Sequence, residues 1–161
     1  RTGRHHLCTD TTAFDSVVGP QLRVVPPGDD HSVRLGNERN GAEAEAMLYH
    51  INVDTTDFDM LILKYAGVMQ DPSHTPEQQP RFRIEVLDSD GRLIQPARCN
   101  SYDFVASSDM GWNTIHSGGE IVLWKDWTTV GVDLSSYHGQ EVQVRLTTYD
   151  CSISAHYSAC D

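Results

Sequence analysis

Four cysteines, Cys8, Cys99, Cys151 and Cys160, are the residues whose chemistry the sequence constrains most. None of them forms a C-x-x-C pair, which argues against a zinc ribbon or a thioredoxin-type redox site. An even number of well-separated cysteines predicts two disulfides and an oxidising compartment, so we expect a secreted or cell-surface protein. Four cysteines allow three connectivities. We favour Cys99–Cys151 and Cys8–Cys160, the second of which would tie the two chain ends together.

The sequence contains no motif that activates a nucleophile, a metal-bound water or a phosphate. G-x-S-x-G, H-E-x-x-H and phosphate-binding glycine loops are all absent. A carboxylate pair of the kind used in glycoside hydrolysis stays open, because only the fold fixes the separation of the 23 Asp and Glu residues. Since carboxylates on a β-sandwich are usually solvated surface groups, we predict that the protein is not an enzyme.

The chain is acidic. Its 161 residues include 12 Lys and Arg against 23 Asp and Glu, which gives a formal net charge of −11. That charge repels phosphate backbones and no basic stripe offsets it, so we expect no nucleic-acid partner. An acidic surface instead favours calcium, which prefers hard oxygen ligands. No apolar run approaches the ~20 residues of a membrane span, so we expect no membrane insertion. The length suits one domain over residues 1–161.

Alternation of apolar and polar residues with a period of two predicts β-strands. A strand over residues 81–87 would point its apolar side chains to one face and its charged side chains to the other, and Asp90–Gly91 then supplies a turn. The same period recurs in residues 47–53, 129–134 and 141–148. Residues 58–69 are apolar nearly throughout, as expected of a central strand covered on both faces, although a short helix also fits.

Long polar connections separate these strands. Residues 71–80 contain three prolines, and residues 107–120 are rich in Ser, Gly and Asn. Roughly eight strands with long loops at both ends describe an all-β jelly roll, a β-sandwich of two antiparallel sheets stapled by the disulfides. Trp112 lies in the most Gly- and Ser-rich loop, so we expect its ring to be exposed. Trp124 and Trp127 would face opposite sides of one extended strand, unless residues 125–126 break that strand.

One block supports a family resemblance. Residues 127–151 read W-T-T-V-G-V-D-L-S-S-Y-H-G-Q-E-V-Q-V-R-L-T-T-Y-D-C. This block resembles a recurring segment of jelly-roll modules in large surface and secreted adhesin-like proteins, notably of Bacteroidetes. Three further features fit the same pattern: Asp71-Pro-Ser-His, Cys99 and the strand that begins at Pro80. The layout is also similar to MAM-type and carbohydrate-binding sandwiches. The resemblance covers roughly residues 32–161.

The resemblance implies a structural calcium ion where an early strand meets the final strand. Its ligands would be an early Glu or Asn, a final-strand Asp and backbone carbonyls. The residues available here are Asn37, Glu43, Glu45 and Asp161, with Glu45 and Asp161 the best single candidates.

The resemblance also directs attention to three loops at the rim: residues 71–80, 107–120 and 152–159. They carry the predicted ligand-binding residues Trp112, His74, His156 and Tyr157. His74 and His156 fall in loops that could bring them together, although a single loop histidine is more often a surface residue than a metal ligand. Related modules end in a Gly-rich segment like G-G-H-F-G-Y, whereas this chain loses the glycines and gains Cys160.

Our leading hypothesis is a non-catalytic, extracellular, adhesin-like binding module. Its partner would be a glycan or a cell-surface protein, with the glycan favoured, and flat aromatic side chains would stack on the sugar. The alternative is a structural subunit that self-assembles into an extracellular filament, sheath or surface layer.

Overall fold

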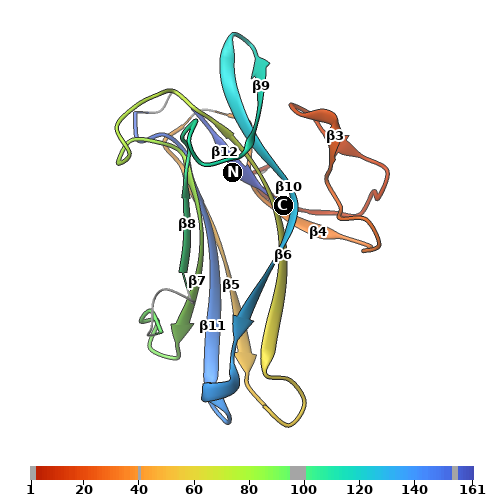
Figure 1. Ribbon diagram of the computed structural model, residues 1–161, viewed down its shortest axis with the longest axis vertical. Helices are drawn as coiled ribbons and strands as arrows, with labels where there is room; N and C mark the ends of the chain where they lie inside the picture. Colours follow the sequence, from red (N-terminus) through yellow and green to blue (C-terminus); the bar gives the residue numbers. More distant parts are fainter. Residues whose placement is uncertain (1–2, 40, 95–100, 154–155) are drawn as a thin grey trace.

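The computed structural model describes residues 3–39, 41–94, 101–153 and 156–161. These residues form two facing antiparallel sheets and a small ribbon (Figure 1). The strands of the six-stranded sheet, in spatial order, are β1 (His5–Cys8), β4 (Ser32–Gly36), β12 (Ser158–Cys160), β6 (Met60–Gln70), β10 (Glu120–Asp133) and β9 (Asn113–Ser117). The four-stranded sheet contains β5 (Ala44–Asn52), β11 (Glu141–Tyr149), β7 (Arg81–Asp88) and β8 (Ser101–Val105). The ribbon pairs β2 (Phe14–Asp15) with β3 (Gly19–Arg23).

The strand order is that of a jelly roll. The group β4-β12-β6-β10 faces the group β5-β11-β7-β8, and β1 and β9 extend the first group at its two edges. The predicted all-β, antiparallel architecture is therefore confirmed.

Among the described residues, none lies in a helix long and apolar enough to cross a membrane.

The main core lies between the two sheets. Phe82, Ile84 and Val86 of β7 are at most 1% exposed and pack with residues of β6, β10 and β11 in one cluster. Their period of two follows from the alternation of side chains along a strand, so the pattern read in residues 81–87 marks the buried face correctly.

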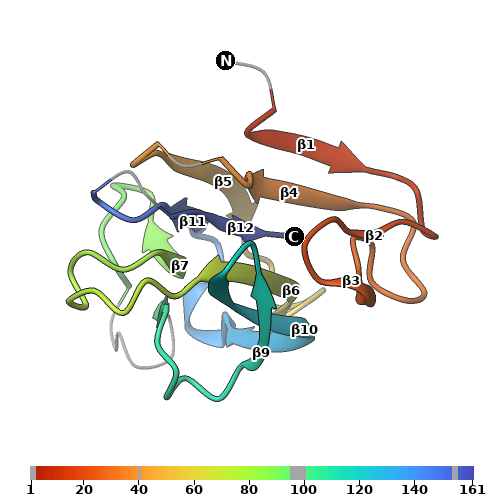
Figure 2. The ribbon, with the colours of Figure 1, turned by 90° about the horizontal axis from the view of Figure 1, so that it is seen from above.

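The six-stranded sheet is covered on its second face as well. A smaller cluster there joins Val18 and Leu22, from the segment that forms the ribbon, to Ala66 and Val68 of β6. Figure 2 shows the β2–β3 ribbon beside β4 and β6. The half of β6 from Tyr65 to Met69 is therefore buried on both faces, as its continuous apolar run predicted, whereas Met60 and Ile62 in its first half are more than half exposed.

A β-bulge in β10 changes the expected orientation of two tryptophans. The pairing of β10 with β6 shifts register between Lys125 and Thr128. An extra residue in one strand reverses the alternation that follows it. Trp124 and Trp127 therefore both pack on the second cluster, on the same side of the sheet.

Strand β9 was missed by the sequence analysis, which assigned all of residues 107–120 to a loop. Its residues pair with β10 through a two-residue turn at Gly118–Gly119, where both glycines have positive φ. Such a turn requires residues that tolerate positive φ and matches the twist of antiparallel strands. The Ser- and Gly-rich composition therefore specifies a hairpin at this point.

The predicted Cys8–Cys160 disulfide is wrong. Cys8 pairs with Ser32 on one side of β4, and Cys160 pairs with Leu35 on the other side. Ser32 and Leu35 are three positions apart along β4, and side chains alternate between the faces of a sheet, so the two cysteines also point to opposite faces. A disulfide needs Cα atoms within about 7 Å, which this placement forbids. Cys8, Cys151 and Cys160 are all buried free thiols, and Cys99 of the predicted Cys99–Cys151 bridge lies outside the described residues.

Candidate functional site

A groove of about 500 Å³ opens where strand β12 ends. Strand β12 separates β4 from β6 up to Asp161, whose backbone N–H and C=O both bond to Ala66. The walls of the groove come from β4 and β6, on either side of Asp161.

The groove passes through the plane of the six-stranded sheet. Its outer rim includes Trp127, Lys64 and Ile62, and its floor reaches Met47 and Leu146 of the opposite sheet. The remaining lining residues come from β4, the preceding loop and the end of β12: Pro26, Asp29, His31, Ser32, Val33, Leu35, Leu63, Cys160 and Asp161. The site thus combines an apolar floor with polar groups at its entrance, as small-ligand sites commonly do.

Two polar groups at the entrance are suited to hydrogen bonding. Lys64 Nζ lies 2.6 Å from Asp29 Oδ2, and both side chains are about 40% exposed. Asp161 Oδ1 is buried and has no hydrogen-bond partner among the described residues. A buried oxygen without a partner is costly, and this one belongs to a residue that lines the groove.

A buried arginine holds Asp161 in this position. The Arg34 guanidinium contacts Asp161 Oδ2 at 3.2 Å and Asp15 Oδ2 at 2.7 Å, and all three side chains are at most 8% exposed. Burial raises the pKa of Asp161 to about 6, with Arg34 opposing and Asp15 adding to that rise. Asp161 is therefore mainly ionised at neutral pH and accepts hydrogen bonds.

The four residues predicted to bind calcium make their contacts in three different places. Asp161 pairs with Arg34, while Glu43 and Glu45 both contact Arg4. Asn37 uses its side-chain oxygen to accept a hydrogen bond from the Arg39 N–H. Guanidinium groups occupy the positions beside these carboxylates, and the structure does not bring the four predicted ligands together. Calcium binding by this set stays a prediction.

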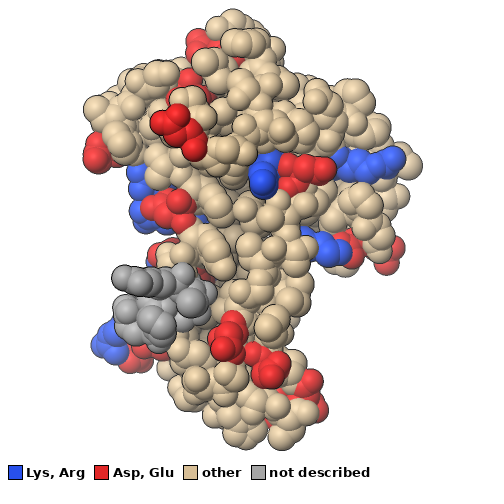
Figure 3. Space-filling model, viewed as in Figure 1, with Lys and Arg blue, Asp and Glu red and all other residues tan. Residues whose placement is uncertain are grey.

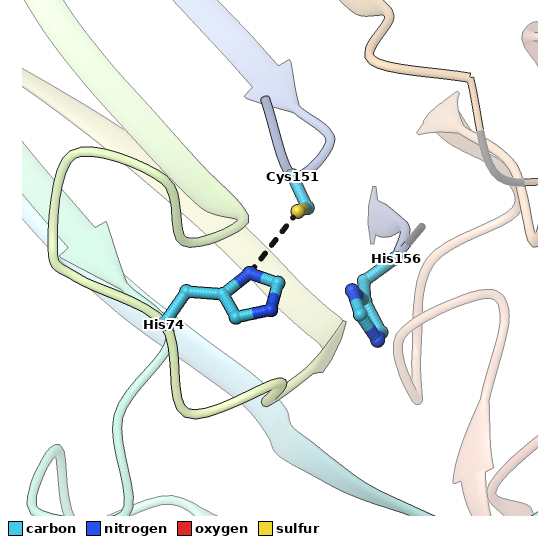
Figure 4. A group of neighbouring side chains, drawn as sticks. All are labelled: His74, Cys151 and His156. Carbon is cyan, nitrogen blue, oxygen red and sulfur yellow. Dashed lines mark hydrogen bonds between the residues drawn. The ribbon is translucent and has the colours of Figure 1, made fainter. Parts of the chain in front are cut away.

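His74 and His156 do come together, and with them Cys151. Figure 4 shows their side chains converging from the loop after β6, the end of β11 and the segment before β12. Cys151 Sγ lies 3.4 Å from His74 Nδ1, and the two imidazole rings are 5.2 Å apart, edge to face. Burial lowers the pKa of His156; Glu120 opposes that lowering and His74 adds to it. Among the described residues this is the one group of His, Cys, Asp and Glu with the spacing of metal ligands.

Two other predicted ligand-binding residues pack against the core or lie within it. Trp112 is partly buried and packs on Phe104, with ring centroids 5.8 Å apart, and directly on the backbone of Gly67. The expectation of an exposed Trp112 is therefore wrong. Tyr157 is 5% exposed and belongs to the second cluster, and burial raises the pKa of its hydroxyl. Their side chains fill the fold and leave little surface for a ligand.

The outer face of the four-stranded sheet offers a second polar surface. Arg83 donates to Asp103 at 2.8 Å and lies over the Tyr149 ring, and Arg145 donates to Glu85 at 2.9 Å. The charges of this face pair with each other. Figure 3 shows basic and acidic groups side by side across the middle of the molecule, whereas acidic groups gather without basic neighbours at the lower right end.

Sequence reasoning missed most of the groove. Trp127 was weighed as a stacking residue without being chosen, and Lys64 and Asp29 carried no signal. These residues come from segments far apart in the chain, and only the end of β12 between β4 and β6 makes them neighbours.

A scan against protein-family models gives no match, and a search of curated proteins gives none either. Among solved structures, the chain is similar to the crystal structure of Caldicellulosiruptor saccharolyticus CBM27-1 in complex with mannohexaose. The identity is 10%, the TM-score is 0.38, and the match covers 84% of this chain and 75% of that chain. At this TM-score, nothing about the ligand or activity of this chain follows from the likeness.

Proposed function

We propose that this chain is a non-catalytic binding module that takes a glycan in the groove beyond β12. The observation that carries the proposal is one concave site that combines the Trp127 ring, the Lys64–Asp29 pair and the unpartnered Asp161 oxygen. Sugars present apolar C–H faces and rows of hydroxyls, which aromatic rings and charged side chains respectively recognise.

The proposed lack of catalysis is supported by the pairing of the groove carboxylates. Asp29 is tied to Lys64 and Asp161 to Arg34. A general acid for glycoside hydrolysis must be placed to donate its proton to the leaving group. Both groove carboxylates are instead engaged by cations of this chain, which suits them to binding.

A glycan array followed by calorimetry tests the proposal. We expect the protein to retain a subset of glycans, and Trp127→Ala to weaken binding of the best one at least tenfold. Tyr149→Ala, on the outer face of the other sheet, is the matched control and should leave the affinity unchanged. Loss of binding in the Tyr149 variant alone, or no retained glycan on a diverse array, would overturn the proposal.

A second candidate function is the predicted self-assembly into a filament, sheath or surface layer. The exposed apolar side chains of Met60 and Ile62 on β6 support it, because a second copy of this chain would cover them. Sedimentation at increasing protein concentration tests this candidate: concentration-dependent growth supports it, and a strictly monomeric species contradicts it.

The extracellular location and the structural calcium also belong to the proposal. Because Cys8 and Cys160 are free, the location loses one of the two bridges that motivated it. Melting temperatures with calcium and with a chelator test the ion: a calcium-dependent rise supports it, and equal temperatures count against it.

A further inference from the structure

The His74–Cys151–His156 cluster shares no residue with the groove and has no role in the proposed glycan binding. It stands at one end of the sandwich, where the loop after β6 meets the connection between β11 and β12. Its three candidate ligand atoms, two imidazole nitrogens and one sulfur, all lie within 4.8 Å of one another.

These distances are close to those of a coordinated ion. Zinc binds sulfur at about 2.3 Å and imidazole nitrogen at about 2.0–2.1 Å in a tetrahedron, which places bound ligand atoms roughly 3.3–3.6 Å apart. The Cys151 Sγ to His74 Nδ1 distance, 3.4 Å, already matches that spacing. The remaining gap of about 1 Å is within the reach of small side-chain rotations.

Backbone and side-chain hydrogen bonds fix the three segments relative to one another. The Cys151 N–H donates to the His156 carbonyl at 3.0 Å, which closes the connection between β11 and β12. The neighbouring Ser152 N–H donates to the Gln78 carbonyl at 3.3 Å, which ties that connection to the loop of His74. Within that loop, Asp71 accepts hydrogen bonds from Ser73 and Gln79.

Two observations point to a ligand for this cluster. His156 Nδ1 is buried and has no hydrogen-bond partner among the described residues, although its ring faces both other members of the cluster. Cys151 is fully buried, so its sulfur cannot reach a substrate as a nucleophile. A small ion can reach it, and would satisfy the unpartnered nitrogen as well.

We propose that His74, Cys151 and His156 bind one zinc ion. Two imidazoles and one thiolate are ligands that zinc prefers. The Cys151 thiol would release its proton to solvent when the ion binds. Because zinc is four-coordinate, three protein ligands leave one position for water. The ion would cross-link the loop after β6 to both ends of the β11–β12 connection.

Metal titration of the reduced, metal-free full chain tests this proposal. Cobalt, which substitutes for zinc, should bind at one equivalent per chain and produce a thiolate-to-cobalt charge-transfer band that zinc abolishes. His74→Ala and His156→Ala should each weaken binding at least tenfold, and Cys151→Ser should remove the charge-transfer band. Zinc should raise the melting temperature of the parent chain but not of these variants.

The controls separate this site from other histidines and thiols. All variants carry His5→Ala and His6→Ala, because adjacent terminal histidines bind metals adventitiously. His116→Ala, an exposed histidine on β9, and Cys8→Ser should leave cobalt affinity unchanged. If Cys151→Ser fails to fold, the two loop histidine variants still decide the result.

Two outcomes would overturn the proposal. The first is the absence of a charge-transfer band in the parent chain, and the second is unchanged affinity in both histidine variants.

Discussion

At Gly67 an indole ring lies directly on the backbone of β6. A Cβ atom at this position would sit 2.6 Å from Cη2 and 2.8 Å from Cζ3 of Trp112. Contacts below 3.0 Å force atoms to move, and Trp112 is held by Phe104 on its other side. The absence of one side chain therefore determines where this tryptophan packs.

Gly67→Ala should destabilise the protein by about 1–3 kcal/mol, as overpacking of a formed core usually does. Gly131→Ala is the matched control, because that glycine also lies in a strand and the nearest atom to its Cβ would be the flexible Met60 sulfur at 3.3 Å. We expect the control to change stability by less than about 0.5 kcal/mol. Urea unfolding measures the stability of both variants. Equal effects would show that contact with Trp112 is not what destabilises the Gly67 variant.

Arg34 is a second residue whose substitution should strongly lower the stability of the fold. It separates two buried carboxylates, Asp15 and Asp161. Arg34→Met would leave both without a counter-charge, and removing one member of a buried ion pair costs about 3–5 kcal/mol. Lys64→Met breaks the exposed pair with Asp29 and should cost less than about 1 kcal/mol. Denaturant unfolding of the two variants would contradict this account if Arg34→Met were the milder change.

At the scale of elements, strand endings and irregularities create the candidate sites. The bulge in β10 turns Trp127 toward the groove, the end of β12 opens it, and the β11–β12 connection brings Cys151 and His156 to His74. Periodicity in the sequence predicted the strands because one-sided burial imposes a period of two. It could not predict the bulge, β9 or the groove, since these depend on register between segments distant in the chain.

Asp150 joins three elements and should make stability depend on pH. Its carboxylate accepts hydrogen bonds from the N–H of Ser158, at the start of β12, and from the N–H of Glu43, before β5. Burial raises the pKa of Asp150 to about 6; the Ser158 bond and Arg4 oppose that rise and Glu45 adds to it.

A raised pKa means that the folded protein binds the proton more tightly than the unfolded chain. The resulting stability is complete below the unfolded pKa near 4 and is lost as pH rises through about 6. The contribution of Asp150 should therefore grow as pH falls from 7 to 5. Unfolding of the parent and of Asp150→Asn over this range measures it, because contributions of histidines cancel in the difference. Parallel stability curves would contradict the prediction.

Over the whole molecule, the hydrophobic core holds the two sheets together, a role that the sequence analysis assigned to disulfides. Two clusters bury the inner face of the six-stranded sheet and part of its second face, while the three described cysteines stay reduced. Cysteine number alone could not reveal this, because pairing depends on which side of β4 each sulfur occupies. His74 and His156 were identified from the sequence, but their partner Cys151 had been assigned to a bridge.

The buried thiols lead to a prediction about how the intact chain reacts with an alkylating agent. Burial raises the pKa of the Cys8 thiol and, more strongly, that of Cys160, with Asp161 adding to the rise in each case. Alkylation of the native protein without reductant should therefore be slow at Cys160. After denaturation, mass spectrometry should find Cys8 and Cys160 fully alkylated. A peptide pair linked through these two residues would contradict the placement of β1 and β12.

The groove beyond β12 as the binding site is the central claim, and mapping by NMR tests it most directly. A glycan retained on the array would be titrated into isotope-labelled protein, and shifts of backbone and indole resonances followed. We predict that the largest shifts occur at Trp127, Lys64 and Val33, which line the groove. Shifts concentrated at Tyr149 and Arg83 on the outer face of the four-stranded sheet, with the groove unchanged, would contradict the claim.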